Sequence, residues 1–310
     1  MPAVYTAEEI LEIVGGRLAS GMIGPEAGSI NTDTRQIKEG DWFLALEGRK
    51  YDGHDFLGDA FAGGAIGGIV AERTRYSIGS NSFPLIAVDA PSKALSLLAR
   101  NWRRRISPKV IALCGTSDEL TELVDLIAAA ERRKVECVHQ CATAQEAAQR
   151  LLNMSEETRL VVVGLSPSAL KEVESAAVAL EPNVLAFLPH AFDNLRLTSQ
   201  PANLKAAKVS LIQNLNKAWA WVLADSPSDE ICELAKANQK AALLTCQEKF
   251  FEAKAWQARG QSSESLAQDY DKALAAISSR LPLWQAWLYI SACGLAGIAP
   301  ARLIDKLKSS

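Results

Sequence analysis

A regular alternation of short apolar runs and helical segments after Pro108 is the feature that most constrains the fold. The apolar runs fall at residues 110–113, 160–163, 184–188, 218–224 and 241–245. The stretches between them are long enough for helices, and a strand–helix–strand rhythm of this kind places helices on both faces of a largely parallel sheet. The sequence therefore predicts a doubly wound α/β domain from residue 108 onward.

The residues before Pro108 follow a less regular pattern. Thr6 with Glu9 has the spacing of a helix N-cap and capping box, and Gly15 ends that helix. Buried strands are predicted at residues 41–47, 65–71 and 85–89, with helices at 54–63 and from Pro91 onward. We place the domain boundary near residue 107, which gives a small mixed α/β domain at 1–107 and a second domain at 108–310.

Composition narrows the classes of partner. The chain has 33 basic and 36 acidic residues and a net charge of −3, so it carries no overall field for nucleic acid. Arg103, Arg104 and Arg105 form a basic triplet, but they stand at the end of a predicted helix, where positive charge favours the macrodipole. We expect no nucleic-acid partner.

Membrane and metal functions are also disfavoured. The first residues lack a basic and apolar leader, and the apolar stretch at residues 284–299 is too short to span a bilayer, so we expect a cytoplasmic protein with no membrane span. Cys137, His139 and Cys141 could be imagined as metal ligands. A zinc site needs about four ligands, however, and no second Cys/His pair follows at a suitable spacing, so we expect no metal.

Two motifs in the first domain carry a family resemblance. They are Asn-Thr-Asp-Thr-Arg-Gln-Ile-Lys-Glu-Gly-Asp-Trp-Phe-Leu-Ala-Leu-Glu-Gly at residues 31–48 and Tyr-Asp-Gly-His-Asp-Phe at 51–56. In this order they resemble the N-terminal domain of the Mur ligases, most nearly the MurF type, the UDP-N-acetylmuramoyl-tripeptide:D-alanyl-D-alanine ligases. The resemblance implies a UDP-sugar-binding first domain and a second domain similar to a P-loop ATPase.

The resemblance also implies which residues contact the nucleotide sugar. They are Thr32, Asp33, Thr34, Arg35, Asp52, Gly53, His54 and Asp55. Hydroxyls and carboxylates can hydrogen-bond uracil and ribose, and an arginine or a turn of backbone amides can meet a pyrophosphate. Turn chemistry explains each residue equally well by itself, with Asp33 and Arg35 tying one turn and Asp52-Gly53 forming a corner.

The second domain departs from the family at its nucleotide loop. The corresponding loop contains Gly115, Thr116, Ser117, Asp118, Glu119 and Thr121. Where the family has Gly-Lys-Thr, this chain has Asp118, Glu119 and Leu120. Carboxylates at a helix N-terminus repel phosphate, whereas the family lysine attracts it, so we interpret the loop as degenerate.

Other positions fit that interpretation. Val162 stands where the family has a metal-binding glutamate, and valine offers Mg²⁺ no oxygen ligand. His190 and Lys208 match a metal-holding histidine and a carbamylated lysine of the family, and we interpret them as relics or as ordinary surface residues. Trp284 and Trp287 align with the adenine contacts, where core packing and base stacking are the two alternatives.

Together these features favour a non-catalytic MurF-like protein that needs neither ATP nor Mg²⁺. Its expected partners are a UDP-N-acetylmuramoyl-peptide, or a full-length Mur ligase or other cell-wall enzyme. The chain ends near Leu307, where the family begins a third domain. The alternatives are a ligase that adds D-alanyl-D-alanine with help from a partner chain, and a structural interaction protein without a ligand.

Overall fold

The protein, seen in a computed structural model, folds into two compact units. The structure describes residues 2–48, 50–72, 83–115, 117–131, 134–141, 143–166, 170–188, 191, 199–215, 220–224, 230–237, 241–245, 264–279, 283–296, 298 and 302–303. The first unit comprises Met1–Ser107, Ala144–Glu157 and Val178–Leu180. The second comprises Pro108–Thr143, Thr158–Ala177 and Glu181–Ser310.

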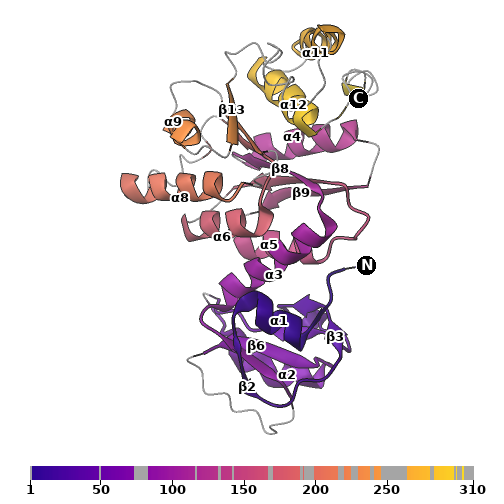
Figure 1. The fold of residues 1–310 in the computed structure, drawn as a ribbon, viewed down its shortest axis with the longest axis vertical. Coiled ribbons are helices and arrows are strands. Elements are labelled where there is room, and N and C mark those ends of the chain that lie inside the picture. Colours follow the sequence, from indigo (N-terminus) through magenta and orange to yellow (C-terminus); the bar gives the residue numbers. More distant parts are fainter. Residues whose placement is uncertain are drawn as a thin grey trace. The chain divides into compact units, whose positions relative to one another are not determined.

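The first unit is built on a five-stranded sheet with the order β2-β7-β6-β5-β4 (Figure 1). Its strands are β2 (Arg17–Ser20), β4 (Ile30–Asn31), β5 (Trp42–Leu44), β6 (Gly67–Ala71) and β7 (Leu85–Val88). Strands β4 to β7 run parallel, and β2 pairs antiparallel with β7. A separate ladder joins β1 (Tyr5–Thr6) to β3 (Ala27–Gly28). The three predicted strands are therefore confirmed, and β2 and β4 are additions to the sheet.

The helices of this unit begin and end as their residue types dictate. In α1 (Ala7–Val14), the Thr6 hydroxyl accepts a hydrogen bond from the Glu9 amide, and the Glu9 carboxylate accepts one from the Thr6 amide, which confirms the capping box. Gly15 ends α1 in the left-handed region, with φ of 66°. The predicted helix at 54–63 is a 3-10 turn η2 (Gly53–Phe56) that continues into α2 (Leu57–Ala62).

Helix α3 (Pro91–Ile106) uses its basic triplet to pack the first unit. Arg103 is buried, and its Nε donates a 3.0 Å hydrogen bond to the carbonyl of Leu180. Arg105 forms a 2.8 Å ion pair with Glu9, and its guanidinium lies 5.1 Å from the centre of the Tyr5 ring. At least two of the three arginines therefore have structural contacts that account for them.

One helix of the first unit comes from much later in the sequence. Helix α5 (Ala144–Leu152) packs against α3 and β4 through an alanine- and leucine-rich face. The Ala3 amide donates to the Leu152 carbonyl over 2.8 Å, and Trp102 Nε1 donates to the Met154 carbonyl over 3.1 Å. The first unit thus draws part of its core from residues 144–157.

The second unit contains a six-stranded sheet with the order β13-β12-β11-β8-β10-β9, and every neighbouring pair is parallel. Its strands are β8 (Lys109–Cys114), β9 (Val135–Cys141), β10 (Leu160–Leu165), β11 (Val184–Phe187), β12 (Ala220–Ala224) and β13 (Ala241–Thr245). Its helices are α4 (Ser117–Ala130), α6 (Leu170–Leu180), α8 (Pro201–Gln213), α9 (Glu230–Ala237), α11 (Glu264–Ile277) and α12 (Leu283–Ala296). Figure 1 shows α4 and α12 along one face of this sheet and α6 and α8 along the other. The predicted doubly wound fold is confirmed, with β9 as a strand that the apolar pattern did not reveal.

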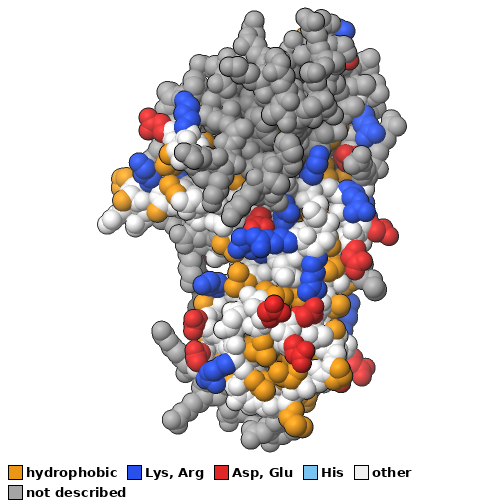
Figure 2. Space-filling model, viewed as in Figure 1, with side chains coloured by type: hydrophobic (Ala, Val, Ile, Leu, Met, Phe, Trp, Pro, Cys, Tyr) orange, Lys and Arg blue, Asp and Glu red, His pale blue; other side chains and the backbone are white. Residues whose placement is uncertain are grey.

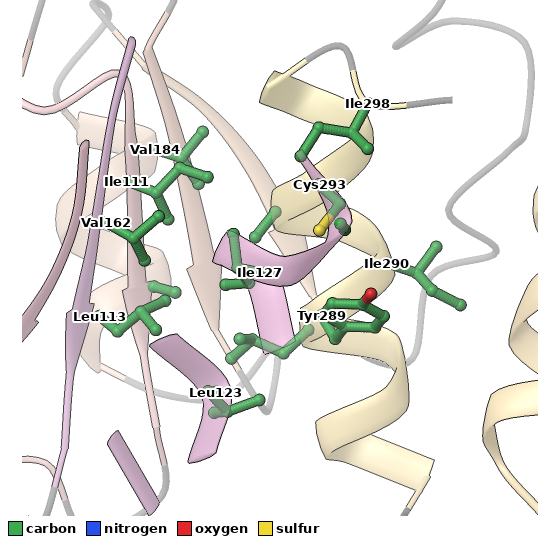
Figure 3. Close-up of a cluster of buried hydrophobic side chains, with 14 of the residues drawn as sticks. Ile111, Leu113, Leu123, Ile127, Val162, Val184, Tyr289, Ile290, Cys293 and Ile298 are labelled. Carbon is green, nitrogen blue, oxygen red and sulfur yellow. The ribbon is translucent and has the colours of Figure 1, made fainter. Parts of the chain in front are cut away.

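The core of the second unit fills the space between its sheet and the pair α4 and α12 (Figure 3). Ile111, Val162 and Val184 stand side by side on three neighbouring strands, because the register pairs Ile111 with both of the others. Ile127 of α4 and Cys293 of α12 lie over them. Burial raises the pKa of the Cys293 thiol well above its ordinary value. None of the helices in the described ranges is both long and apolar enough to cross a membrane.

Candidate functional site

The parallel strands of the first unit bring the candidate binding residues to one edge of its sheet. Asn31 ends β4, Leu44 ends β5 and Ala71 ends β6, and these strands are direct neighbours. The Thr32–Arg35 turn and the Asp52–Asp55 turn therefore both follow carboxyl ends of parallel strands. Ligands of open α/β sheets bind at such an edge.

The turn after β4 is organised by Asn31 and Asp33. Asn31 Oδ1 accepts a hydrogen bond from the Asp33 amide at 3.1 Å, and its Nδ2 donates to the Gln36 carbonyl at 3.0 Å. Asp33 caps the short 3-10 turn η1 (Thr34–Gln36) by accepting from the Arg35 amide at 3.1 Å. These are the bonds of an Asx turn, which asparagine and aspartate favour.

Arg35 and Asp33 also form a two-pronged ion pair. Arg35 donates from Nε to Asp33 Oδ1 at 2.9 Å and from Nη2 to Oδ2 at 2.7 Å. The side-chain hydrogen bonds from Arg35 lower the pKa of Asp33 to about 2. The Arg35 side chain is nonetheless 86% exposed, so its outer N–H groups face solvent.

The turn after β5 uses its own polar groups internally. Gly53 N donates to the Leu46 carbonyl at 2.8 Å, His54 N to Asp52 Oδ1 at 3.0 Å, and Asp55 N to the Asp52 carbonyl at 3.1 Å. A Cβ on Gly53 would lie 2.6 Å from Leu46 N, which explains the glycine. These amides cannot also cradle a pyrophosphate in this conformation.

His54 is a buried connector between this turn and β6. Its Nε2 accepts a 2.9 Å hydrogen bond from the Ala71 amide, so the ring proton must lie on Nδ1. Nδ1 lies 2.5 Å from Asp52 Oδ1 and donates to it. The backbone hydrogen bond from His54 lowers the pKa of Asp52. His54 therefore positions the turn, while Asp55 is exposed at its surface.

Thr32 has a partner that the sequence did not reveal. Gln149 of α5 accepts from the Thr32 hydroxyl at 3.4 Å and donates from Nε2 to the Ile30 carbonyl at 2.9 Å. The position of Gln149 in the sequence of α5 does not indicate that its side chain contacts residues more than a hundred positions earlier. The first unit therefore contributes a later helix to the edge that carries the candidate residues.

Acidic side chains and an exposed tyrosine stand near this edge. Asp89 follows β7, and Glu72 follows β6 and forms a 2.8 Å ion pair with Arg17. Tyr51, immediately before Asp52, is 72% exposed. Figure 2 shows acidic side chains around a hydrophobic patch on the visible face of the first unit. Within the Thr32–Arg35 turn, the exposed guanidinium of Arg35 is the group that can attract an anionic ligand.

The loop that corresponds to the family's nucleotide loop lies at the expected junction between a strand and a helix. β8 ends at Cys114 and α4 begins at Ser117. Asp118 and Glu119 belong to the first turn of α4, while Thr121 is exposed. Thr116 and the side chains of Ser117, Asp118 and Glu119 lie outside the described residues.

Apolar packing closes over the start of this loop. A Cβ on Gly115 would lie 2.8 Å from Leu188 Cδ2, so the leucine after β11 already covers the glycine. The Gly115 amide donates to the Leu165 carbonyl at 3.1 Å, and the Leu188 amide donates to the Cys114 carbonyl at 2.8 Å. The glycine of this loop is therefore used for close packing and not as an open phosphate donor.

The positions beside the loop are equally apolar. Val162 and Leu120 are both fully buried in the core of the second unit, and Figure 3 labels Val162. Leu120 packs near Gly164, where an added Cβ would lie 3.2 Å from Leu120 Cβ. Mg²⁺ prefers oxygen ligands and phosphate needs exposed donors. The described residues at this edge do not fit ATP with Mg²⁺.

The two expected relics have different outcomes. His190 lies outside the described residues. Lys208 is on α8 and only 2% exposed, so the interpretation as an ordinary surface residue is wrong for it. No residue pattern in the sequence predicted this burial.

Two groups of side chains contain residue types that can bind a metal ion. Glu47, Asp52 and His54 place ligand atoms within 4.8 Å of one another, the one such group among the described residues. Both His54 ring nitrogens already take part in hydrogen bonds, however, so the group lacks its imidazole ligand. Cys137, His139 and Cys141 lie on β9, where His139 Nε2 instead lies 2.6 Å from Asp125 Oδ1.

The alternatives for the two tryptophans of α12 can be compared at Trp287. Trp287 of α12 is 4% exposed and belongs to the core of the second unit, which supports core packing over base stacking. The side chain of Trp284 lies outside the described residues.

Comparison with curated proteins gives a consistent set of relatives. No protein-family model matches the chain. The chain is 29% identical over 251 residues to a UDP-N-acetylmuramoyl-L-alanyl-D-glutamate–2,6-diaminopimelate ligase of Syntrophomonas wolfei, covering 73% of this chain and 50% of that ligase. It is 28% identical over 209 residues to a UDP-N-acetylmuramoyl-tripeptide–D-alanyl-D-alanine ligase of Haemophilus influenzae, covering 64% of this chain and 45% of that ligase. The chain thus spans about half the length of these relatives.

Solved structures agree at the level of fold. A crystal structure of MurF from Acinetobacter baumannii matches 79% of this chain and 53% of that chain, with a TM-score of 0.66 and 22% identity. MurF from Thermotoga maritima in complex with ADP matches 70% of this chain and 50% of that chain, with a TM-score of 0.55 and 21% identity. The curated relatives are Mur ligases, MurF ligases among them, and the solved structures share their fold with this chain.

Proposed function

We propose that this chain, whose curated relatives are Mur ligases, is a MurF-like protein of peptidoglycan synthesis that binds a UDP-N-acetylmuramoyl-peptide without ATP chemistry. The carboxyl edge of the sheet in the first unit is its binding site. The apolar edge in the second unit is a structural remnant of a nucleotide site. The observation that carries the second part is the packing of Leu188 over Gly115, next to the buried Val162 and Leu120.

The first unit supports binding through side chains that remain exposed. Arg35 keeps its outer N–H groups in solvent while Asp33 fixes its orientation. A preoriented guanidinium is suited to a pyrophosphate because its donors are planar and paired. Thr34 and Asp55 stand on the same edge as further hydrogen-bonding groups.

Isothermal titration of UDP-N-acetylmuramoyl-tripeptide into the protein tests the binding function. We expect saturable binding, and we expect Arg35→Ala to weaken it by roughly ten- to a hundredfold, since a charge-assisted hydrogen bond contributes roughly 1.5–3 kcal/mol. Arg104→Ala is the matched control: it removes an exposed arginine from the last turn of α3, at the other end of a helix that starts beside the binding edge. No binding at millimolar ligand would rule out this function.

A second titration tests the absence of ATP chemistry. We expect no heat from ATP with Mg²⁺ and no phosphate release when ATP, UDP-N-acetylmuramoyl-tripeptide and D-alanyl-D-alanine are mixed with the protein. Steady phosphate release that requires all three would instead support the ligase alternative.

A further inference from the structure

We propose that Gln149 is a positioning residue of the binding site, acting from α5 on the turn that follows β4. This inference rests on the proposed function, because it assumes that the turn after β4 binds a ligand. Gln149 makes two hydrogen bonds here, one to the last strand before the turn and one to the first residue of the turn.

The first contact fixes the strand from which the turn emerges. β4 is the edge strand of the sheet and has only β5 as a ladder partner. Gln149 Nε2 donates to the Ile30 carbonyl at 2.9 Å, an ordinary length for such a bond. The glutamine thus satisfies a backbone acceptor on a strand of only two residues. Few backbone hydrogen bonds to β5 fix the direction in which the chain leaves this strand.

The second contact fixes the first residue of the turn. Gln149 Oε1 accepts from the Thr32 hydroxyl at 3.4 Å, a longer and weaker contact than the one to Ile30. Thr32 is followed directly by Asp33, which orients Arg35. A shift of β4 or of Thr32 would therefore move the guanidinium that the proposed site uses for an anionic ligand.

The packing of α5 holds the backbone of Gln149 in place. The helix buries five side chains and is tied to the first unit at its end by the bond from the Ala3 amide to the Leu152 carbonyl. Gln149 itself is partly exposed and carries no charge, so its contribution comes from its two hydrogen-bond groups. Gln145 lies on the same helix at an exposed position, which provides a matched control.

The test compares Gln149→Met, Thr32→Val and the double variant, with Gln145→Met as the control. UDP is the probe, titrated calorimetrically at a temperature where circular dichroism shows every variant folded. We expect Gln149→Met to weaken UDP binding about five- to tenfold, as the loss of one or two neutral hydrogen bonds would. Gln145→Met should leave the affinity unchanged.

The double variant separates positioning from general destabilisation. If Gln149 acts through the turn, the two losses of UDP affinity are not additive. The dissociation constant of the double variant is then less than about twice that of the single variant that binds UDP more weakly. A Gln149→Met protein that melts earlier but binds UDP like the unaltered protein overturns the inference and leaves the proposed function standing. An unaltered protein that binds neither UDP nor the full precursor overturns the proposed function, and the positioning role with it.

Discussion

The two sheets of this protein end in carboxyl edges of opposite character. In the first unit, the turns after β4 and β5 present hydroxyls, carboxylates and one exposed guanidinium. In the second unit, the described side chains at the corresponding edge after β8, β10 and β11 include the buried Leu120, Leu165 and Leu188, and Leu188 packs on Gly115. Both edges have the topology at which ligands bind, and their described side chains differ in chemistry.

The difference teaches that one topology can carry edges of different chemistry. The junction after Gly115 joins β8 to α4, and both elements pack within the same unit. The side chains around it follow the rules of a core, where apolar groups fill space and polar groups are excluded. The first unit instead keeps polar groups whose partners are mostly within their own turns.

Replacing Val162 by glutamate should give the largest effect and attacks the apolar edge directly. The substitution restores an oxygen ligand, but it places a carboxylate in a fully buried apolar cluster. We expect a loss of about 3–5 kcal/mol in the free energy of unfolding, seen by calorimetry as a fall of roughly 10 °C in melting temperature.

Val162→Thr is the control, because it has nearly the same shape and carries no charge. It should lower the free energy of unfolding by about 1–2 kcal/mol. A Val162→Glu protein with unchanged melting temperature and measurable Mg²⁺ binding would mean that the edge is an open site, and the comparison between the two edges would collapse.

Substitution of His54 comes next and tests whether the polar edge is held by its own turns. His54→Phe removes the acceptor of the Ala71 amide and the donor to Asp52. We expect a loss of about 2 kcal/mol in the free energy of unfolding, since an unpaired buried amide costs roughly 1–3 kcal/mol. Urea unfolding measures it.

Two amide variants divide that effect. His54→Gln can still reach the Ala71 amide, whereas His54→Asn can reach only Asp52. Because the Asp52 side chain is 45% exposed and can use water, we expect the glutamine variant to be the more stable of the two. Equal stability of all three variants would show that neither bond holds the turn.

The sequence could predict most of the second unit because its pattern is local. Long apolar runs mark β8, β10 and β11, and each helix between them has its own period. β9 was missed because Glu136, His139 and Gln140 interrupt its apolar run. The resemblance to Mur ligases located the loop at Gly115, but only the packing of Leu188 revealed how it is filled.

The first unit shows where sequence reasoning stops. The capping box at Thr6 and the Asx turn at Asp33 are local and could be predicted from residue types. Helix α5 belongs to the first unit, and Gln149 contacts residues of β4 and its turn, although more than a hundred residues separate them in the sequence. A local pattern in one sequence carries no information about such a long-range contact. The burial of Lys208 is another outcome of tertiary packing.

The smallest effect is electrostatic and concerns the pairing of Asp33 with Arg35. Arg35 holds the pKa of Asp33 at about 2, against an ordinary value of 3.8. A lowered pKa of a carboxyl group stabilises the folded state above the ordinary pKa, and that contribution is lost as the pH falls through the folded value. The stabilising contribution of this pair is therefore complete at neutral pH and disappears between about pH 4 and pH 2.

Arg35→Ala should raise the pKa of Asp33 toward 3.8 without reaching it, because the Arg35 backbone amide still donates to the carboxylate. Carbon-13 NMR titration of the Asp33 carboxyl group measures the midpoint. Arg17→Ala breaks the ion pair with Glu72 and should leave the Asp33 midpoint unchanged. An unchanged midpoint in Arg35→Ala would mean that the guanidinium is not held by Asp33 in solution. The polar edge would then lose the one cation that the turn orients toward a ligand.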